Sequence, residues 1–416
     1  MKTLKNIGKI ALLSLALCGG TTSCNYLDVV PPEQASLPDA TKDPESTLGF
    51  LFSCYGGIRN PFDYQTVEAG ADEYVLPPLW NTGSQKITWD LNLPTNIADG
   101  WSWGSNYRFI GQCLLFLQQL PHARGVTDEQ KRAWAAEANF LLAYYHMVTL
   151  VAYGPCPITD TYIDQATPES EYNGRMHFDY VKDWICQKFD EVCEDGQLPA
   201  TRTGDEWGRA TSVMAKALKA RLLVYAASPL FNGSFPYKDW ENTNFETPGY
   251  GKELISLKYD RTKWEVAKAA CQEAITAAEA AGHKLFSLED AQSLYQQAGL
   301  PLPFVPFKSA EGGTADKDKE FMERVQLMRY VVTTRYKEGN RETIWGLANQ
   351  GTMIIGSIPH RVIKNNQGTW KAGYSGVSPT LNTVEHFYTE NGVPIEKDKQ
   401  FYPQSEWYQS AGVTDR

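Results

Sequence analysis

The stretch TDEQKRAWAAEANFLLAYYHMVTLVAYGP, residues 127–155, decides the fold of this chain. Thr127 followed three residues later by Gln130 forms a capping box, in which each side chain can accept the backbone N–H of the other residue. No glycine or proline interrupts the run until Gly154 and Pro155, a pair that ends a helix. The stretch therefore predicts one long α-helix over residues 127–152.

Small residues recur at helical spacing inside this stretch. Ala135, Ala138 and Leu142 share one face of the predicted helix, and Tyr145 follows them. The segment AKALKARLLVYAA, residues 215–227, repeats this order of small and then large residues. Small residues on a helix face let a neighbouring helix approach closely, as in the helical hairpins of tetratricopeptide repeats. The spacing between the copies is irregular, so the sequence predicts degenerate repeats.

Apolar periodicity, capping residues and helix breakers predict further helices along the chain. These helices are expected over residues 43–58, 106–120, 178–193, 211–227, 260–281 and 379–389. Thr380 and Asn382 are the two candidate caps of the last helix.

The rest of the chain is rich in glycine, proline and charged clusters. Residues 308–319 are expected to form a surface loop, and residues 343–347 and 353–358 to form short strands. The predicted fold class is therefore mainly α, with a tetratricopeptide-like helical-hairpin scaffold, a loop-rich remainder and a few short strands. The expected division of the single domain is a scaffold over 43–60 and 105–282 and a loop-rich part over 61–104 and 283–416.

The first residues are typical of a secretory signal. Three lysines precede the apolar run IALLSLALC, residues 10–18. A helix needs about 20 residues to cross a bilayer, so this run is too short to be a membrane anchor. We expect a signal peptide over residues 1–23 and an N-terminal arm over residues 24–42.

Cys24 is the expected lipidation site. Thr22 and Ser23 before it are small, and a lipoprotein peptidase requires a cysteine at the new N-terminus to carry the lipid. Cys18 is a poorer candidate because it lies inside the apolar run, directly after the bulky Leu17. The alternative is plain secretion with a free or oxidised Cys24.

Charge and cysteine content exclude several classes of protein. The formal net charge is −10 and the pI is about 5.3, which disfavours a nucleic-acid partner because phosphate binding needs a basic surface. Six cysteines remain outside the signal and the lipidation site, and no CxxC motif occurs. These cysteines are expected to be mostly buried small apolar residues. No metal site and no cofactor are expected.

No established catalytic motif occurs in the sequence. HExxH, G-x-S-x-G and P-loop motifs are absent, and His146 is expected to be a hydrogen-bonded core residue of the long helix. A glycoside hydrolase would need two carboxylates facing each other across a cleft. Asp72 with Glu73, or Glu342 with Glu385, are the pairs that the sequence offers for this alternative. We expect a protein that is not an enzyme.

Aromatic side chains are abundant, with 12 Trp and 22 Tyr, and several stand among polar residues in expected loops. An indole or phenol ring can stack on the apolar face of a sugar, while Asp, Glu and Asn can pair with its hydroxyls. Loops on a rigid scaffold are also where binding residues concentrate. The candidate ligand-binding residues are Asp72, Glu73, Trp80, Asn81, Trp89, Trp101, Trp103, Trp370 and Tyr374. The alternative is that these rings pack the loops onto the helices.

Several segments together resemble one family. CNYLDVVPPE (24–33) is similar to the lipidated N-terminus and extended arm of SusD/RagB-type outer-membrane lipoproteins of the Bacteroidetes. EANFLLAYYHMVTLVAYGPCPIT (137–159) resembles their most characteristic helix, with Leu142 where Arg is common and Cys156 where Gly is common. Later segments resemble the family in the same order: GRATSVMAKALKARLLVYAASP (208–229), NRETIW (340–345) and SPTLNTVEHFYTENG (378–392).

The resemblance implies a palmitate-bearing surface lipoprotein on the outer membrane, facing the cell exterior. Such proteins bind an oligosaccharide, or in some relatives a peptide, and pass it to a SusC-type TonB-dependent transporter without catalysis. In the family, Thr414, Asp415 and Arg416 would be followed by a further segment, so we expect this chain to be truncated at its C-terminus. A surface lipoprotein glycoside hydrolase and a peptide-binding or interaction scaffold remain the alternatives.

Overall fold

The structure is a computed structural model. It describes residues 37–58, 68–80, 83–93, 95–96, 103–164, 166–297, 323–324, 327–328, 330–332, 334–347, 363–364, 367, 370–371, 376–389 and 392–399. Four of the expected site residues lie outside this part of the chain: Cys24, Asn81, Trp101 and Tyr374. The expected loop over 308–319 and the expected strand over 353–358 lie outside it too.

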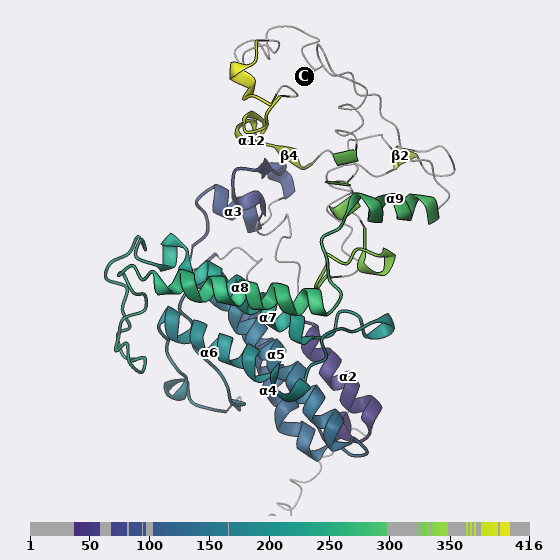
Figure 1. Ribbon diagram of the computed structural model, residues 1–416. Helices are drawn as coiled ribbons and strands as arrows, with labels where there is room; N and C mark the ends of the chain where they lie inside the picture. The colour runs from purple at the N-terminus through teal and green to yellow at the C-terminus, as the bar shows by residue number, and fades with distance from the viewer. Residues whose placement is uncertain are drawn as a thin grey trace, which may run out of the picture.

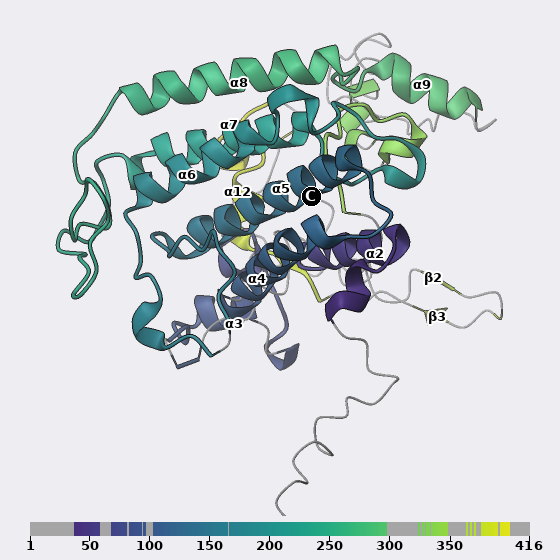
Figure 2. The same cartoon turned by 90° about the horizontal axis from the view of Figure 1, so that it is seen from below.

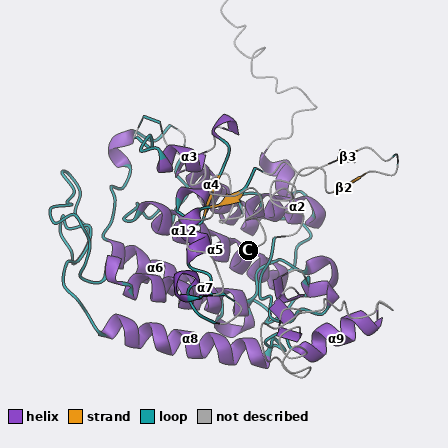
Figure 3. Ribbon diagram, turned by 90° about the horizontal axis from the view of Figure 1, so that it is seen from above, coloured by secondary structure: helices purple, strands orange, loops and turns teal. Residues whose placement is uncertain are grey.

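Six helices form the scaffold, and neighbours in the sequence pack side by side (Figures 1 and 2). They are α2 (Pro44–Tyr55), α4 (Trp103–Gln119), α5 (Asp128–Tyr153), α6 (Phe178–Glu191), α7 (Ser212–Ala227) and α8 (Thr262–Ala280). All six were predicted, with ends that differ from the prediction by a few residues. Helix is the dominant structure of the described chain, as Figure 3 shows, and the predicted mainly-α fold class is confirmed.

Helix α5 lies at the centre of the scaffold, and most of its side chains are buried. The predicted capping box is present, because the Thr127 side chain accepts the Gln130 N–H and the Gln130 side chain accepts the Thr127 N–H. The helix ends at Gly154, whose φ of 68° is a conformation that glycine adopts at little cost. On the face of α5 that the repeat pattern predicts, Ala138, Leu142 and Tyr145 are buried and Ala135 is partly buried. Helix α8 buries a stripe of alanines next to α7: Ala267, Ala270, Ala274 and Ala278.

The loop-rich remainder contains short elements above the scaffold in Figure 1. They are the helices α3 (Gly83–Thr88), α9 (Leu288–Gln297) and α12 (Leu381–Glu385), and the strands β1 (Tyr74–Val75), β2 (Ile363–Lys364), β3 (Trp370–Lys371) and β4 (Ser378–Pro379). The strands form two antiparallel pairs, β1 with β4 and β2 with β3. Single 3-10 turns also occur at Leu37–Thr41, Glu68–Gly70, Pro78–Trp80, Leu120–His122, Glu169–Glu171, Glu194–Gly196, Gly204–Glu206, Pro229–Phe231, Tyr336–Glu338 and Ile395–Lys397.

Three expectations for this remainder need correction. Helices α3 and α9 form where only loops and short apolar runs were expected. Residues 343–347 are not a strand: they are irregular, and Trp345 packs on the scaffold instead. The predicted helix over 379–389 is shorter, since α12 covers five residues, and Thr380 is its cap.

Candidate ligand-binding surface

Two segments from distant parts of the sequence meet at the β1–β4 pair. Tyr74 pairs with Pro379, and Val75 with Ser378. The Thr380 N–H then donates to the Glu73 carbonyl at 3.1 Å, which extends the pairing by one residue. We call the segments 68–80, 376–389 and 392–396 together the junction surface. It is where the predicted site residues Asp72, Glu73 and Trp80 lie.

Asp72 holds the start of α12 in place. The Asn382 side-chain amide donates to the Asp72 carboxylate, and the Thr380 hydroxyl donates to the Asp72 carbonyl. The Thr383 hydroxyl donates to the same carbonyl at 3.1 Å. Thr380 also caps the helix, because its hydroxyl oxygen accepts the Thr383 N–H at 3.1 Å. The exposed Asp72 therefore fixes the positions of the polar side chains at the start of α12.

The two tryptophans of this region differ in exposure. Trp80 is half-buried with Ala69 and Leu76, and its ring covers Gly376. A Cβ atom at Gly376 would lie 2.3 Å from that ring, so only glycine fits there without a shift. Trp89, just after α3, is 46% exposed. The Trp89 side chain is therefore accessible to a ligand over more of its surface than the half-buried Trp80 side chain.

Trp103 and Trp370 lie in regular structure. Trp103 is the first residue of α4, and its ring centroid lies 5.1 Å from that of Tyr107 and 5.2 Å from that of Tyr153. The Arg175 guanidinium lies over the Trp103 ring, 4.7 Å from the centroid, which is a cation–π contact. Trp103 thus packs the start of α4 onto the end of α5, the role that the alternative interpretation gave to these rings. The backbone of Trp370, in β3, pairs with Lys364.

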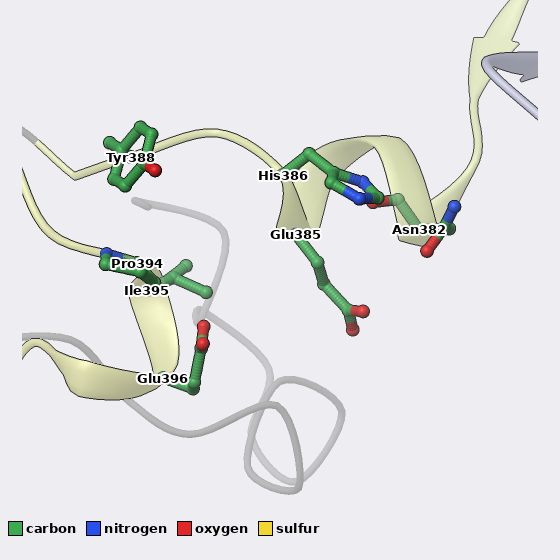
Figure 4. Close-up of a pocket in the computed structure, with 7 residues that line it drawn as sticks. All are labelled: Asn382, Glu385, His386, Tyr388, Pro394, Ile395 and Glu396. Carbon is green, nitrogen blue, oxygen red and sulfur yellow. The ribbon is translucent and has the colours of Figure 1, made fainter.

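The junction surface also contains an open pocket of about 480 Å³ (Figure 4). It is lined by Asn382, Glu385, His386, Tyr388, Pro394, Ile395 and Glu396. Figure 4 shows the carboxyl groups of Glu385 and Glu396 extending from two separate turns. Atom Oε1 of Glu385 is buried and has no hydrogen-bond partner in the described part of the chain. Tyr388, 69% exposed, adds a ring to this acceptor-rich pocket.

Sequence reasoning missed most of this pocket. It considered Glu385 only as half of a hydrolase pair, and Asn382 only as a helix cap. The other acid of that pair, Glu342, accepts the Phe286 N–H at 3.0 Å and so holds the start of α9 in place. The signal that could have found the pocket is the run NTVEHFY, residues 382–388, where rings stand beside acceptors in a short helix and its exit.

One serine–histidine pair invites a catalytic interpretation. The Ser256 hydroxyl lies 3.2 Å from Nε2 of His177, a distance typical of a nucleophile and its base. However, Nδ1 of His177 accepts the Asp179 N–H at 3.1 Å, so in the neutral ring the proton is on Nε2. Burial lowers the pKa of His177 to about 4, which favours this neutral ring. Nε2 then donates to Ser256 and cannot accept its proton, so the pair caps α6 and is not a catalytic dyad.

Within the described ranges, no group of three or more His, Cys, Asp or Glu side chains could hold a metal ion. The helices described there are all too short or too polar to cross a membrane.

Solved structures show what this chain is similar to. A comparison with protein-family models gives no match, and a comparison with curated proteins gives none either. The solved protein BT4246 matches with a TM-score of 0.76 and 51% identity, over 90% of this chain and 62% of its own. A SusD-like protein from Bacteroides fragilis, BF3747, matches with a TM-score of 0.57 and 16% identity, over 87% of this chain and 56% of its own.

The fold is SusD-like. The surface glycan-binding protein A of Bacteroides uniformis has a related architecture, with a TM-score of 0.50 and 13% identity over 83% of this chain and 61% of its own. This chain therefore spans less than two thirds of each of these three proteins. At such low identity, the two distant matches concern the fold alone.

Proposed function

We propose that this SusD-like chain is a member of the SusD/RagB family and binds oligosaccharides at the cell surface. It captures a glycan and delivers it to a SusC-type TonB-dependent transporter. The observation that carries the proposal is the SusD-like fold, which a protein named as surface glycan-binding shares. The 51% identity to BT4246, a protein whose name states no activity, supports common ancestry with a solved relative.

The chemistry of the junction surface supports a glycan as the ligand. Sugar hydroxyls need donors and acceptors, and Asp72, Asn382 and Glu385 lie together on this surface. Pyranose rings need apolar platforms, and exposed rings are offered by Tyr388 on this surface and by Trp89, which lies outside it just after α3. The proposed ligand-binding set remains Asp72, Glu73, Trp80, Asn81, Trp89, Trp101, Trp103, Trp370 and Tyr374, and the pocket adds Glu385 and Tyr388.

A lipid anchor at Cys24 would hold this surface over the transporter. Tethering a binding protein beside a pore raises the local concentration of its ligand without any new contact. The proposed location is the outer membrane, with the protein facing the cell exterior. We propose no enzymatic activity for it.

Affinity electrophoresis through a panel of neutral and acidic polysaccharides tests the glycan proposal. We expect retardation by at least one of them, and a loss of most of that retardation in Trp89→Ala and Tyr388→Ala. Trp264→Ala is the matched control, because Trp264 is 42% exposed but lies on α8, across the scaffold from α3 in Figure 2. Retardation that Trp264→Ala removes and the other two variants retain would place the binding site elsewhere.

A further inference from the structure

Helices α2 and α4 pack in an antiparallel register that several contacts fix. The Phe50 and Phe116 rings meet edge to face, with centroids 5.4 Å apart. The Gln112 side-chain amide donates to the Ser53 hydroxyl at 2.8 Å. At the other end of the contact, the Phe109 ring fills the place where a Cβ atom of Gly57 would lie, at 2.4 Å.

This register puts two cysteines opposite each other. Cys54 lies about one helical turn from Phe50 and from Gly57, and Cys113 about one turn from Phe116 and from Phe109. Atom Sγ of Cys54 lies 3.7 Å from the Gln112 carbonyl oxygen, directly beside Cys113 in the sequence. The register and this contact place the Cys54 thiol next to Cys113 on the facing helix.

Both thiols are sealed in the core, with no exposed surface. Burial raises the pKa of the Cys113 thiol well above its ordinary value, and the neighbouring Cys54 thiol raises it further. Cys156 and Cys193 have different neighbours: Cys156 lies beside the Tyr107 hydroxyl, and Cys193 donates to the Ser212 carbonyl at 3.7 Å. The Cys54–Cys113 pair therefore differs from these cysteines in lying at the contact between two packed helices, with both residues fully buried.

We propose that Cys54 and Cys113 form a disulfide that joins α2 to α4 when the chain folds in an oxidising compartment. The oxidant is a small-molecule or protein disulfide, R–S–S–R′. One cysteine thiolate attacks it and releases R–S⁻, and the second cysteine then attacks the mixed disulfide and releases R′–S⁻. The two cysteine protons pass to the released thiolates, so two thiols are oxidised and one disulfide is reduced to two thiols.

The burial of both cysteines determines when the disulfide can form during folding. Thiol–disulfide exchange needs a thiolate that the oxidant can reach, and neither cysteine offers one once the helices have packed. The bond therefore forms before α2 and α4 close on each other, and the closed core then protects it from reductants. For the protein in cells, this inference depends on the export that the proposed function includes.

Non-reducing peptide mapping tests the proposal directly. The protein is isolated from the cell envelope with an alkylating agent in the lysis buffer and digested with trypsin. Peptides 43–59 and 109–124 carry one cysteine each, so we expect them as a single linked mass that separates on reduction. Alkylated Cys54 and Cys113 in the two separate peptides would overturn the proposal.

Refolding of the purified protein tests the disulfide independently of export. The reduced, denatured chain is refolded in a mixture of reduced and oxidised glutathione, and the same linked peptide is expected. The melting temperature of that product should fall by several degrees on reduction, but it should not change on reduction in Cys54→Ser/Cys113→Ser. Cys271→Ser is the control that should melt like the wild type in both conditions, since Cys271 lies on α8.

The outcomes separate the two proposals. A linked peptide after refolding but free thiols in the protein from cells would overturn the disulfide in vivo, and glycan retardation would be unaffected. Loss of glycan retardation across the whole panel, with the linked peptide present, would count against the proposed function alone.

Discussion

At the scale of single residues, Glu137 is the clearest case of a buried charge that the fold compensates. Its carboxylate, fully buried in α5, accepts hydrogen bonds from Arg202 at 2.9 Å and from Arg209 at 2.6 Å. The Tyr55 hydroxyl donates to it at 2.6 Å and itself accepts the Ala210 N–H at 2.9 Å. One side chain thus joins α2, α5 and the segment that leads into α7.

Glu137→Gln should destabilise the protein strongly, because it removes the buried countercharge of two arginines and leaves them only the exposed Glu206 as an ion-pair partner. Removing one partner of a buried ion pair costs about 3–5 kcal/mol. Urea denaturation should show a loss of this size, while Glu279→Gln, at an exposed position of α8, should change stability by less than about 0.5 kcal/mol. Equal midpoints for the two variants would contradict this assignment.

His146 makes the stability of the fold depend on pH. Its Nε2 accepts the Thr159 N–H at 3.1 Å, so Nδ1 carries the proton and donates to the Leu142 carbonyl at 2.8 Å. Complete burial lowers the pKa of His146 to about 4, whereas an unfolded histidine has a pKa of 6.5. Between these values the unfolded chain binds a proton that the folded chain does not.

Stability is therefore complete above pH 6.5 and decreases as the pH falls toward 4. For His146 alone, the free energy of unfolding should fall by about 2 kcal/mol between pH 7 and pH 5. Urea titrations at the two pH values measure it, and His146→Gln should reduce the difference. The control His122→Gln changes a histidine at an exposed position and should keep the wild-type difference in unfolding free energy between pH 7 and pH 5. An equal reduction of that difference in both variants would contradict the role of His146.

At the scale of elements, Trp345 connects the loop-rich part to the scaffold. Its ring packs on Phe140 and Tyr144 of α5, with centroids 5.6 and 5.3 Å apart, and its Nε1–H donates to the Gly208 carbonyl at 3.0 Å. Trp345→Ala should cost about 2 kcal/mol, roughly half the loss for a fully buried ring. Limited trypsin digestion should then cut faster after Lys337 and Arg341, while Trp264→Ala should leave this rate unchanged.

The elements that sequence could predict are those fixed by local signals. Helices α4 to α8 have their own apolar periodicity and caps or breakers, and Thr127 with Gln130 marks the start of α5 without help from distant residues. The β1–β4 pair has two residues in each strand, joined across about 300 residues of sequence, so no local pattern could reveal it. Residues 343–347 have strand-forming side chains, but the packing of Trp345 overrides that preference.

The candidate site was predictable in part for the same reason. Polar residues beside rings marked Asp72 and Trp80, but nothing near them in the sequence indicated Asn382 or Gly376 as their partners. Trp103 could not be separated from the loop rings, because its burial depends on Tyr153 and Arg175, which are far along the chain.

At the scale of the whole molecule, the proposed lipidation of Cys24 would determine where this surface is presented. Cells fed labelled palmitate should incorporate the label into the wild type but not into Cys24→Ser, and the variant should leave the membrane fraction. Cys18→Ser, the matched control, should keep the label. Label retained in Cys24→Ser would contradict the proposed anchor.

The hydrogen bond that the Thr380 hydroxyl donates to the Asp72 carbonyl also constrains the order in which parts of the chain can fold. Helices α4 to α8 pack on their sequence neighbours, so the scaffold can form quickly from local contacts. The junction surface must wait for a segment 308 residues further along the chain. A partly synthesised or partly exported chain can thus have a folded helical body and still lack a complete junction surface. We therefore expect the junction surface to form late in folding. Ligand binding to that surface would show when it is complete.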